Sequence, residues 1–143
     1  MKNIIFGENF NFDCYTIVMK KLFQIFFVSF YLNFIWENAH AFLYASYQNG
    51  AITEFILFRA ALGDAMILTL LALPFIYSAY FKNKKWLVIP AGIFIAVVIE
   101  LFALRTGRWE YNAFMPLIPI IHVGLTPTLQ LGLLGYLTYV LLI

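Results

Sequence analysis

Residues 86–104 read WLVIPAGIFIAVVIELFAL, an apolar stretch in which Glu100 is the one charged side chain. A helix needs roughly 20 mostly apolar residues to cross a hydrocarbon core about 30 Å thick. This stretch therefore predicts a transmembrane helix. The whole chain is 64% hydrophobic and 11% charged, with no polar stretch long enough to form a soluble domain.

Three further apolar stretches predict spans of similar length. They run from Leu22 to Trp36 with a continuation to Tyr47, from Phe55 to Phe81, and from Pro119 to Ile143. The runs are continuous, whereas barrel strands would alternate apolar and polar residues. The predicted fold class is all-α: a polytopic four-transmembrane-helix bundle over residues 22–143, preceded by a short cytoplasmic segment, residues 1–21.

Lysine placement predicts the orientation. Lys2, Lys20 and Lys21 precede the first span, and residues 82–85 place three lysines between the second and third. Because positive loops stay cytoplasmic, both termini are expected on that side of the bacterial inner (plasma) membrane. Arg105 and Arg108 then lie on the outer side, against the rule, which suggests a role other than topology.

Ionisable groups inside the spans mark the candidate site, because each is costly in lipid unless paired or hydrated. The helix rise places Glu37 and Glu100 roughly 21–22 Å from the cytoplasmic edge. Arg59, Asp64 and His122 also fall in the outer half. These groups predict a polar cavity that opens outward, with catalytic candidates Asp64, Glu37, Glu100 and His122.

Asp64 and Arg59 receive different predictions. They are five residues apart, about 140° around a helix, and so are poorly placed to pair with each other. Arg59 is expected to form a structural ion pair with a carboxylate of another helix. Asp64 is the deepest group and has no cation at its level, which makes it a candidate proton carrier or general acid.

The fourth span carries polar residues every four positions. His122, Thr126 and Gln130 would share one helix face, and Pro119 and Pro127 interrupt the backbone beside them. Gln130 is therefore a ligand-binding candidate. A polar seam between helices, with close approach at Gly124, Gly132 and Gly135, is the equally weighted alternative.

Glu37 and His40 form Glu-x-x-His, the spacing that occurs twice in di-iron bundles but only once here. A metal site would have to combine these two residues with Asp64, Glu100 and His122. A Glu37–His40 pair hydrogen-bonded inside the bundle is favoured instead, so no metal site is predicted. His40 is retained as a ligand-binding candidate, and the sequence indicates no particular cofactor.

The loop RTGRWEY, residues 105–111, is the densest polar string in the chain. Arginines beside aromatic rings at a membrane surface suit phosphate headgroups or another anionic ligand. Arg105, Arg108, Trp109 and Tyr111 are therefore headgroup-binding candidates. An interfacial aromatic belt with two solvated arginines is the alternative.

From Trp36 to Gln130 the chain resembles a family of small, uncharacterised bacterial integral membrane proteins. The resemblance rests on Trp36-Glu37, Gly63-Asp64, Glu100 with the string of residues 106–111, and Gly124-Leu125-x-Pro127 ahead of Gln130. It implies a four-helix membrane protein and adds no established activity.

Three functions fit these observations. The favoured one is binding of a lipid- or isoprenoid-like amphiphile in the outer cavity, with acid–base chemistry at Asp64 left open, so that enzyme status is undecided. A small oligomeric proton- or cation-coupled transporter or channel is the second, and an accessory subunit of a membrane complex the third. Membrane lipids, a second copy or a membrane subunit are the expected partners; the net charge of +2, carried by loop lysines, indicates no nucleic acid.

Overall fold

The computed structural model describes residues 5–143, with side chains from residue 15 onward. It is mostly helical, at 74%. Four helical segments are long and apolar enough to cross a membrane, and each corresponds to one of the four predicted apolar stretches: Tyr15–Leu43, Glu54–Tyr77, Lys85–Arg105 and Leu125–Leu142.

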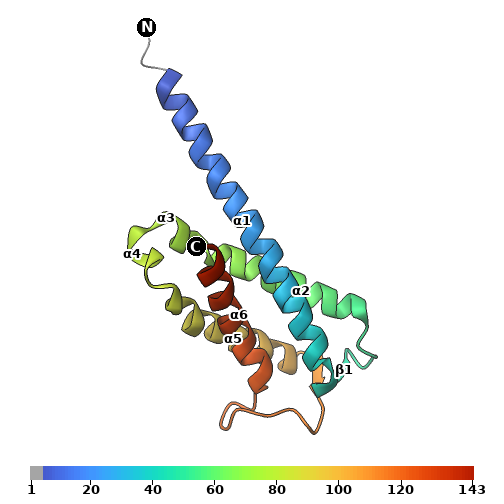
Figure 1. The fold of residues 1–143 in the computed structure, drawn as a ribbon. Coiled ribbons are helices and arrows are strands. Elements are labelled where there is room, and N and C mark those ends of the chain that lie inside the picture. Colours follow the sequence, from blue (N-terminus) through green and yellow to red (C-terminus); the bar gives the residue numbers. More distant parts are fainter. Residues whose placement is uncertain (1–4) are drawn as a thin grey trace.

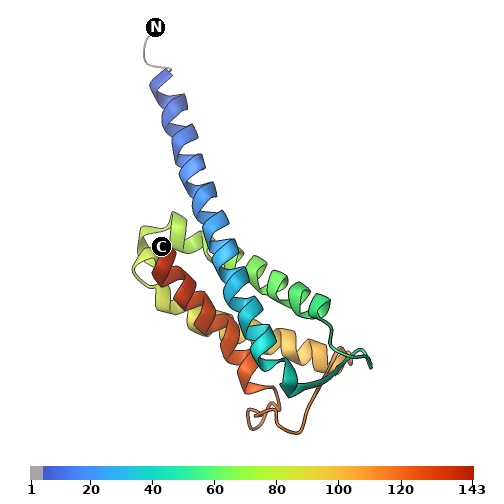
Figure 2. The ribbon, with the colours of Figure 1, turned by 45° about the vertical axis from the view of Figure 1, so that its right-hand side comes forward.

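The helices associate as two pairs. Helix α1 (Ile5–His40) packs along α2 (Glu54–Leu71), and α5 (Val88–Arg105) packs along α6 (Leu125–Leu142). Contact between α1 and α6 joins the pairs, whereas α2 and α5 have no comparable contact. The C-terminus and the start of α1 lie toward the end of the bundle that carries α3 (Leu73–Tyr77) and α4 (Ala79–Lys82), and α1 projects beyond it (Figure 1; Figure 2).

Helix α1 differs from its prediction at both ends. It begins at Ile5, so the helix extends well ahead of the predicted start of the span at Leu22. It ends at His40, and the predicted helical continuation to Tyr47 is wrong. A 3-10 turn, η1 (Ala41–Leu43), leads instead into strand β1 (Tyr44–Tyr47).

Strand β1 pairs antiparallel with β2 (Trp109–Tyr111), so the fold is not purely helical. The pairing satisfies backbone groups of aromatic residues that fit a pleated surface well. Ser46 faces Glu110 and donates its hydroxyl hydrogen to Oε2 at 2.7 Å. The two strands thereby tie the α1–α2 connection to the loop between α5 and α6.

The second and fourth spans are shorter as regular helix than predicted. After α2, Pro74 stands in the first turn of α3, where its missing N–H costs no hydrogen bond. A second 3-10 turn, η2 (Lys85–Leu87), leads into α5. Helix α6 begins at Leu125, not Pro119, because Ile120 and His122 have positive φ angles of 80° and 54°. No α-helix contains such angles.

The α5–α6 contact is the tightest in the bundle. A Cβ placed on Gly92 would lie 2.6 Å from the backbone nitrogen of Gly132, so the two helices touch through their main chains. Toward the α3 end, Tyr139 packs its ring against Phe75 and donates its hydroxyl to the carbonyl of Leu68. This apolar core closes one end of the bundle and leaves the sheet end more open.

Candidate functional site

A cavity of about 320 Å³ lies where α2 and α5 face each other without packing. Helix α2 contributes apolar and small side chains to one wall, and α5 contributes Ala96, Ile99 and Ala103 to the other. Gly63 borders the cavity, and a Cβ added there would meet no heavy atom within 4 Å. The polar lining comes from all four spans and the β strands: Glu37, Tyr44, Tyr47, Arg59, Asp64, Glu100, Arg108, Trp109 and Gln130.

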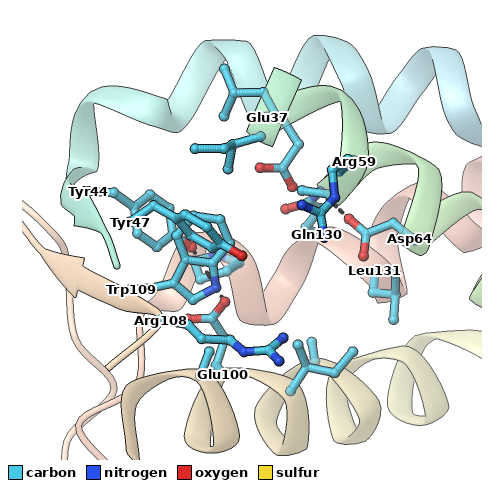
Figure 3. A pocket seen from close by; sticks show the side chains of 18 of the residues that line it. Glu37, Tyr44, Tyr47, Arg59, Asp64, Glu100, Arg108, Trp109, Gln130 and Leu131 are labelled. Carbon is cyan, nitrogen blue, oxygen red and sulfur yellow. Dashed lines mark hydrogen bonds between the residues drawn. The ribbon is translucent and has the colours of Figure 1, made fainter. Parts of the chain in front are cut away.

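Two carboxyl groups and an amide form the floor of the cavity (Figure 3). The Nε2 group of Gln130 donates to Oε1 of Glu37 at 2.8 Å and to Oδ2 of Asp64 at 2.9 Å. The same nitrogen lies 3.0 Å from Oδ1 of Asn33. An amide NH₂ carries two hydrogens, so three acceptors share two donors.

Glu37 and Asp64 accept from the same nitrogen of Gln130, so their carboxyl groups lie close together on the floor. Two carboxylates at such close range would repel each other, and a proton on one of them relieves this repulsion. Glu37 is almost fully buried, whereas Asp64 is half-buried at the cavity edge.

Buried polar side chains continue from the floor into the bundle. Asn33 donates to the carbonyl of Ser29 at 2.8 Å, and the Ser29 hydroxyl lies 3.4 Å from that of Thr138. Sequence reasoning did not select these three residues. The spacing of Ser29, Asn33 and Glu37 at four-residue intervals was the available signal, because it places them on one face of α1.

Glu100 is held by two tyrosines. The Tyr111 hydroxyl donates to its Oε2 at 2.5 Å, and that of Tyr44 lies 3.5 Å from its Oε1. Tyr111 also accepts the backbone N–H of Gly124 at 2.9 Å, where α6 begins. Burial, with the neighbouring Glu100 charge, raises the pKa of both phenols. Both stay neutral hydrogen-bond donors over the physiological range.

Aromatic rings cover the cavity at the sheet end. The Trp109 ring lies 4.6 Å from the ring of Tyr47 and 5.3 Å from that of Tyr44, centroid to centroid. All three side chains line the cavity, so the antiparallel pairing of β1 with β2 is what assembles this cap.

Two arginines border the cavity, and both are exposed. The guanidinium of Arg59 lies 5.9 Å from the ring centroid of Phe55, and that of Arg108 lies 5.3 Å from the ring centroid of Phe102. The predicted ion pair of Arg59 is wrong: no carboxylate oxygen of the described residues lies within 4.0 Å of it. Arg59 is exposed at the cavity edge, five residues before Asp64 in α2.

Several predicted site residues lie elsewhere. His122 is exposed in the loop before α6, so it shares no helix face with Gln130 and its predicted place in the bundle is wrong. Arg105 is exposed and does not line the cavity. Tyr111 reaches the cavity through Glu100 and is not part of its lining.

His40 is buried but does not line the cavity, and the predicted Glu37–His40 hydrogen bond is not formed. Its Nδ1 lies 2.6 Å from the carbonyl oxygen of Trp36, and its Nε2 has no partner among the described residues. Glu37 turns to Gln130 instead. Within the described residues no group of three or more His, Cys, Asp or Glu side chains could hold a metal ion.

Comparisons with protein-family models, with curated proteins and with solved structures found no match for this chain. The family resemblance described from the sequence therefore stays a prediction, and the function must be inferred from the geometry of the cavity.

Proposed function

We propose that the protein binds a lipid- or isoprenoid-like amphiphile with an anionic headgroup in the cleft between α2 and α5. The observation that carries this proposal is the cavity of about 320 Å³, which has two arginines without carboxylate partners at its edge and hydrogen-bonded acids on its floor. A cavity of this size suits a small-molecule ligand.

The tail of the amphiphile enters from the bilayer side. Helices α2 and α5 are both membrane-spanning and do not seal against each other. Ala60, Gly63, Ala96 and Ala103 keep the walls shallow, so an acyl or prenyl chain can lie between the helices. Burial of that chain contributes roughly 25 cal/mol per Å² of apolar surface.

The headgroup lies between Arg59 and Arg108. A guanidinium makes paired, charge-assisted hydrogen bonds to phosphate oxygens, and an arginine that has no carboxylate partner has all its donors available. Trp109 and Tyr47 lie at the same end and provide an amphipathic rim suited to the headgroup level.

The floor supplies the chemistry of the site. Asp64 borders the cavity, so its carboxyl group can exchange a proton with a polar group of the ligand. Gln130 then compensates the acid that loses the proton by donating to it. If the ligand is also a substrate, Asp64 is the proton donor and Glu37 retains the charge.

The test uses dodecyl phosphate that carries a photoreactive diazirine, with the full chain in nanodiscs. Cross-links are expected on residues 56–67 of α2 and 96–103 of α5, and excess dodecyl phosphate should abolish them. Cross-links spread equally over outward-facing residues such as Phe94 and Leu133 would contradict the proposal, and so would equal competition by dodecanol.

A matched pair of variants at Gly63 sharpens this test. Gly63→Leu fills the cavity and should lower the affinity at least about ten-fold, whereas Gly63→Ala adds a single methyl group in open space and should leave it nearly unchanged. Equal binding by the two variants would place the ligand elsewhere.

Asp64→Asn separates binding from proton transfer. An asparagine oxygen still accepts the hydrogen bond from Gln130, so the variant should keep its thermal stability and lose proton-dependent activity or binding. An Asp64→Asn protein with unchanged pH-dependent binding of dodecyl phosphate would show that the acid has no functional role.

A proton-coupled transporter is the second candidate, and the column Asn33, Ser29 and Thr138 favours it. Toward the α3 end, however, Ile25, Leu68 and Tyr139 are fully buried and leave no polar continuation. Amphiphile binding is therefore favoured over proton-coupled transport as the function of the cavity. Proton uptake into proteoliposomes that Asn33→Leu abolishes would reverse this order.

The proposal places both termini in the cytoplasm of a bacterial cell and the cavity toward the outer face. In a Cys14→Ser background, a membrane-impermeant thiol reagent should label Thr106→Cys in intact cells and should leave Lys84→Cys unlabelled. The opposite pattern would invert the orientation without affecting the proposed ligand.

A further inference from the structure

A second cavity, of about 330 Å³, lies at the opposite end of the bundle from the first. It is lined by Lys82, Asn83, Lys85, Trp86, Tyr136 and Val140, which come from α4, the link that follows it, η2 and α6. We propose that this cavity holds the phosphate headgroup of an anionic phospholipid.

The charged side chains that line this cavity are all positive. The sequence has no Asp or Glu between residues 65 and 99, and none after Glu110. Lys82 and Lys85 line the cavity, and neither has an ion-pair partner among the described residues. Anionic lipids attract basic residues beside a span by roughly 1 kcal/mol for each Lys or Arg.

The third lysine of the link is oriented differently. The ammonium of Lys84 lies 3.5 Å from the ring centroid of Tyr80, in a cation–π contact, and its side chain does not line the cavity. Lys82 and Lys85 thus line the cavity, whereas Lys84 contacts the ring of Tyr80.

The remaining lining suits a lipid better than a free ion. Trp86 and Tyr136 are 56% and 38% exposed, and Val140 is also exposed. Aromatic residues with an apolar body and a polar tip favour the headgroup level of a bilayer. The lysines fit the phosphate, and these three side chains fit the glycerol and the first part of the acyl chains.

The experiment measures lipid binding to the full chain by native mass spectrometry, with phosphatidylglycerol and phosphatidylcholine added separately. Phosphatidylglycerol should bind at least about ten-fold more tightly. Lys82→Gln combined with Lys85→Gln should remove this preference, while Lys20→Gln combined with Lys84→Gln, an equal loss of charge away from the cavity, should retain it.

Gly63→Leu distinguishes this site from the α2–α5 cleft, because it should remove one bound anionic amphiphile and leave the second. If the two lysine double variants lose the preference for phosphatidylglycerol equally, the lipid is attracted by the overall positive charge and not by this cavity, and the proposal is overturned. Displacement of the lipid by millimolar inorganic phosphate would overturn it in favour of a site for the free ion. If the Lys82 and Lys85 double variant fails to fold, Tyr136→Leu provides a second test and should weaken phosphatidylglycerol binding. Unchanged binding by Tyr136→Leu would also overturn the proposal.

Discussion

Helix α5 has two neighbours that it meets in opposite ways. Toward α6 it is closed, because Gly92 and Gly132 bring the two backbones into contact. Toward α2 it is open, and the space holds the cavity that Gly63 borders. Gly92 and Gly132 thus permit contact between two helices, whereas Gly63, in similar apolar surroundings, borders empty space. The difference teaches that a small residue in a span specifies close approach only when a second helix is there to approach.

The largest loss of stability is expected where a side chain is added at a position that has no free space. A Cβ on Gly92 would lie 2.7 Å from the Cα of Gly132, and backbone atoms cannot yield as a side chain does. Gly92→Val should therefore lower the free energy of unfolding by about 3 kcal/mol. Reversible unfolding in mixed micelles would measure this. The matched change Gly63→Val should cost little, and equal losses at the two sites would remove the distinction between the closed and open faces of α5.

Gln130 connects the two helix pairs, because it lies on α6 and its partners lie on α1 and α2. Gln130→Leu leaves the buried oxygens of Asn33 and Glu37 without this donor. The change should lower the free energy of unfolding by about 2 kcal/mol. The same unfolding assay tests it, with the exposed residue change Gln24→Leu as control. A stable Gln130→Leu protein would mean that the floor is hydrated and not held by the amide.

Tyr111 fixes the sheet end of α5 by its bonds to Glu100 and to the start of α6. Tyr111→Phe should lower the free energy of unfolding by about 1 kcal/mol at neutral pH. The change Tyr47→Phe, in the partner strand β1, leaves both of these bonds intact and should have a smaller effect.

The pH dependence of this contribution has a defined sign. The pKa of Tyr111 is raised in the folded protein above its usual value of 10.0, chiefly by burial. Its contribution is therefore complete below the usual pKa and is lost as the pH rises further. Unfolding free energies measured from neutral pH to strongly alkaline pH should consequently fall less steeply for Tyr111→Phe than for the unaltered chain. Parallel curves for the two proteins would show that folding does not raise the pKa of the Tyr111 phenol.

The smallest effect on stability is expected at the open edge. Arg59→Leu should change the free energy of unfolding by less than about 0.5 kcal/mol, because exposed charges without a close partner contribute little. It should still weaken dodecyl phosphate binding, which Arg105→Leu, outside the cavity, should not. A clear loss of stability with unchanged binding would restore the ion-pair interpretation that the sequence favoured.

The gaps in the sequence-based prediction have identifiable causes. The helix at the start of the fourth span was predicted from hydropathy, but Ile120 and His122 take backbone conformations that hydropathy does not report. The β1–β2 pairing joins segments more than sixty residues apart, and no local pattern within Tyr44–Tyr47 names its partner. The ion pair of Arg59 is not formed because Arg59 is exposed at the cavity edge, whereas Glu37 and Glu100 are buried and bind Gln130 and Tyr111.

The sequence by itself determined four helices long and apolar enough to span a membrane, because an apolar run of sufficient length has few other stable conformations in lipid. It also singled out Glu37, Asp64, Glu100 and Gln130, since polar groups in such runs must find partners. Only the tertiary structure decided which partners they find: Gln130 bridges the acids, and one tyrosine from each of β1 and β2 binds Glu100. Those choices depend on which helix faces meet, and that is fixed by packing between segments far apart in the chain.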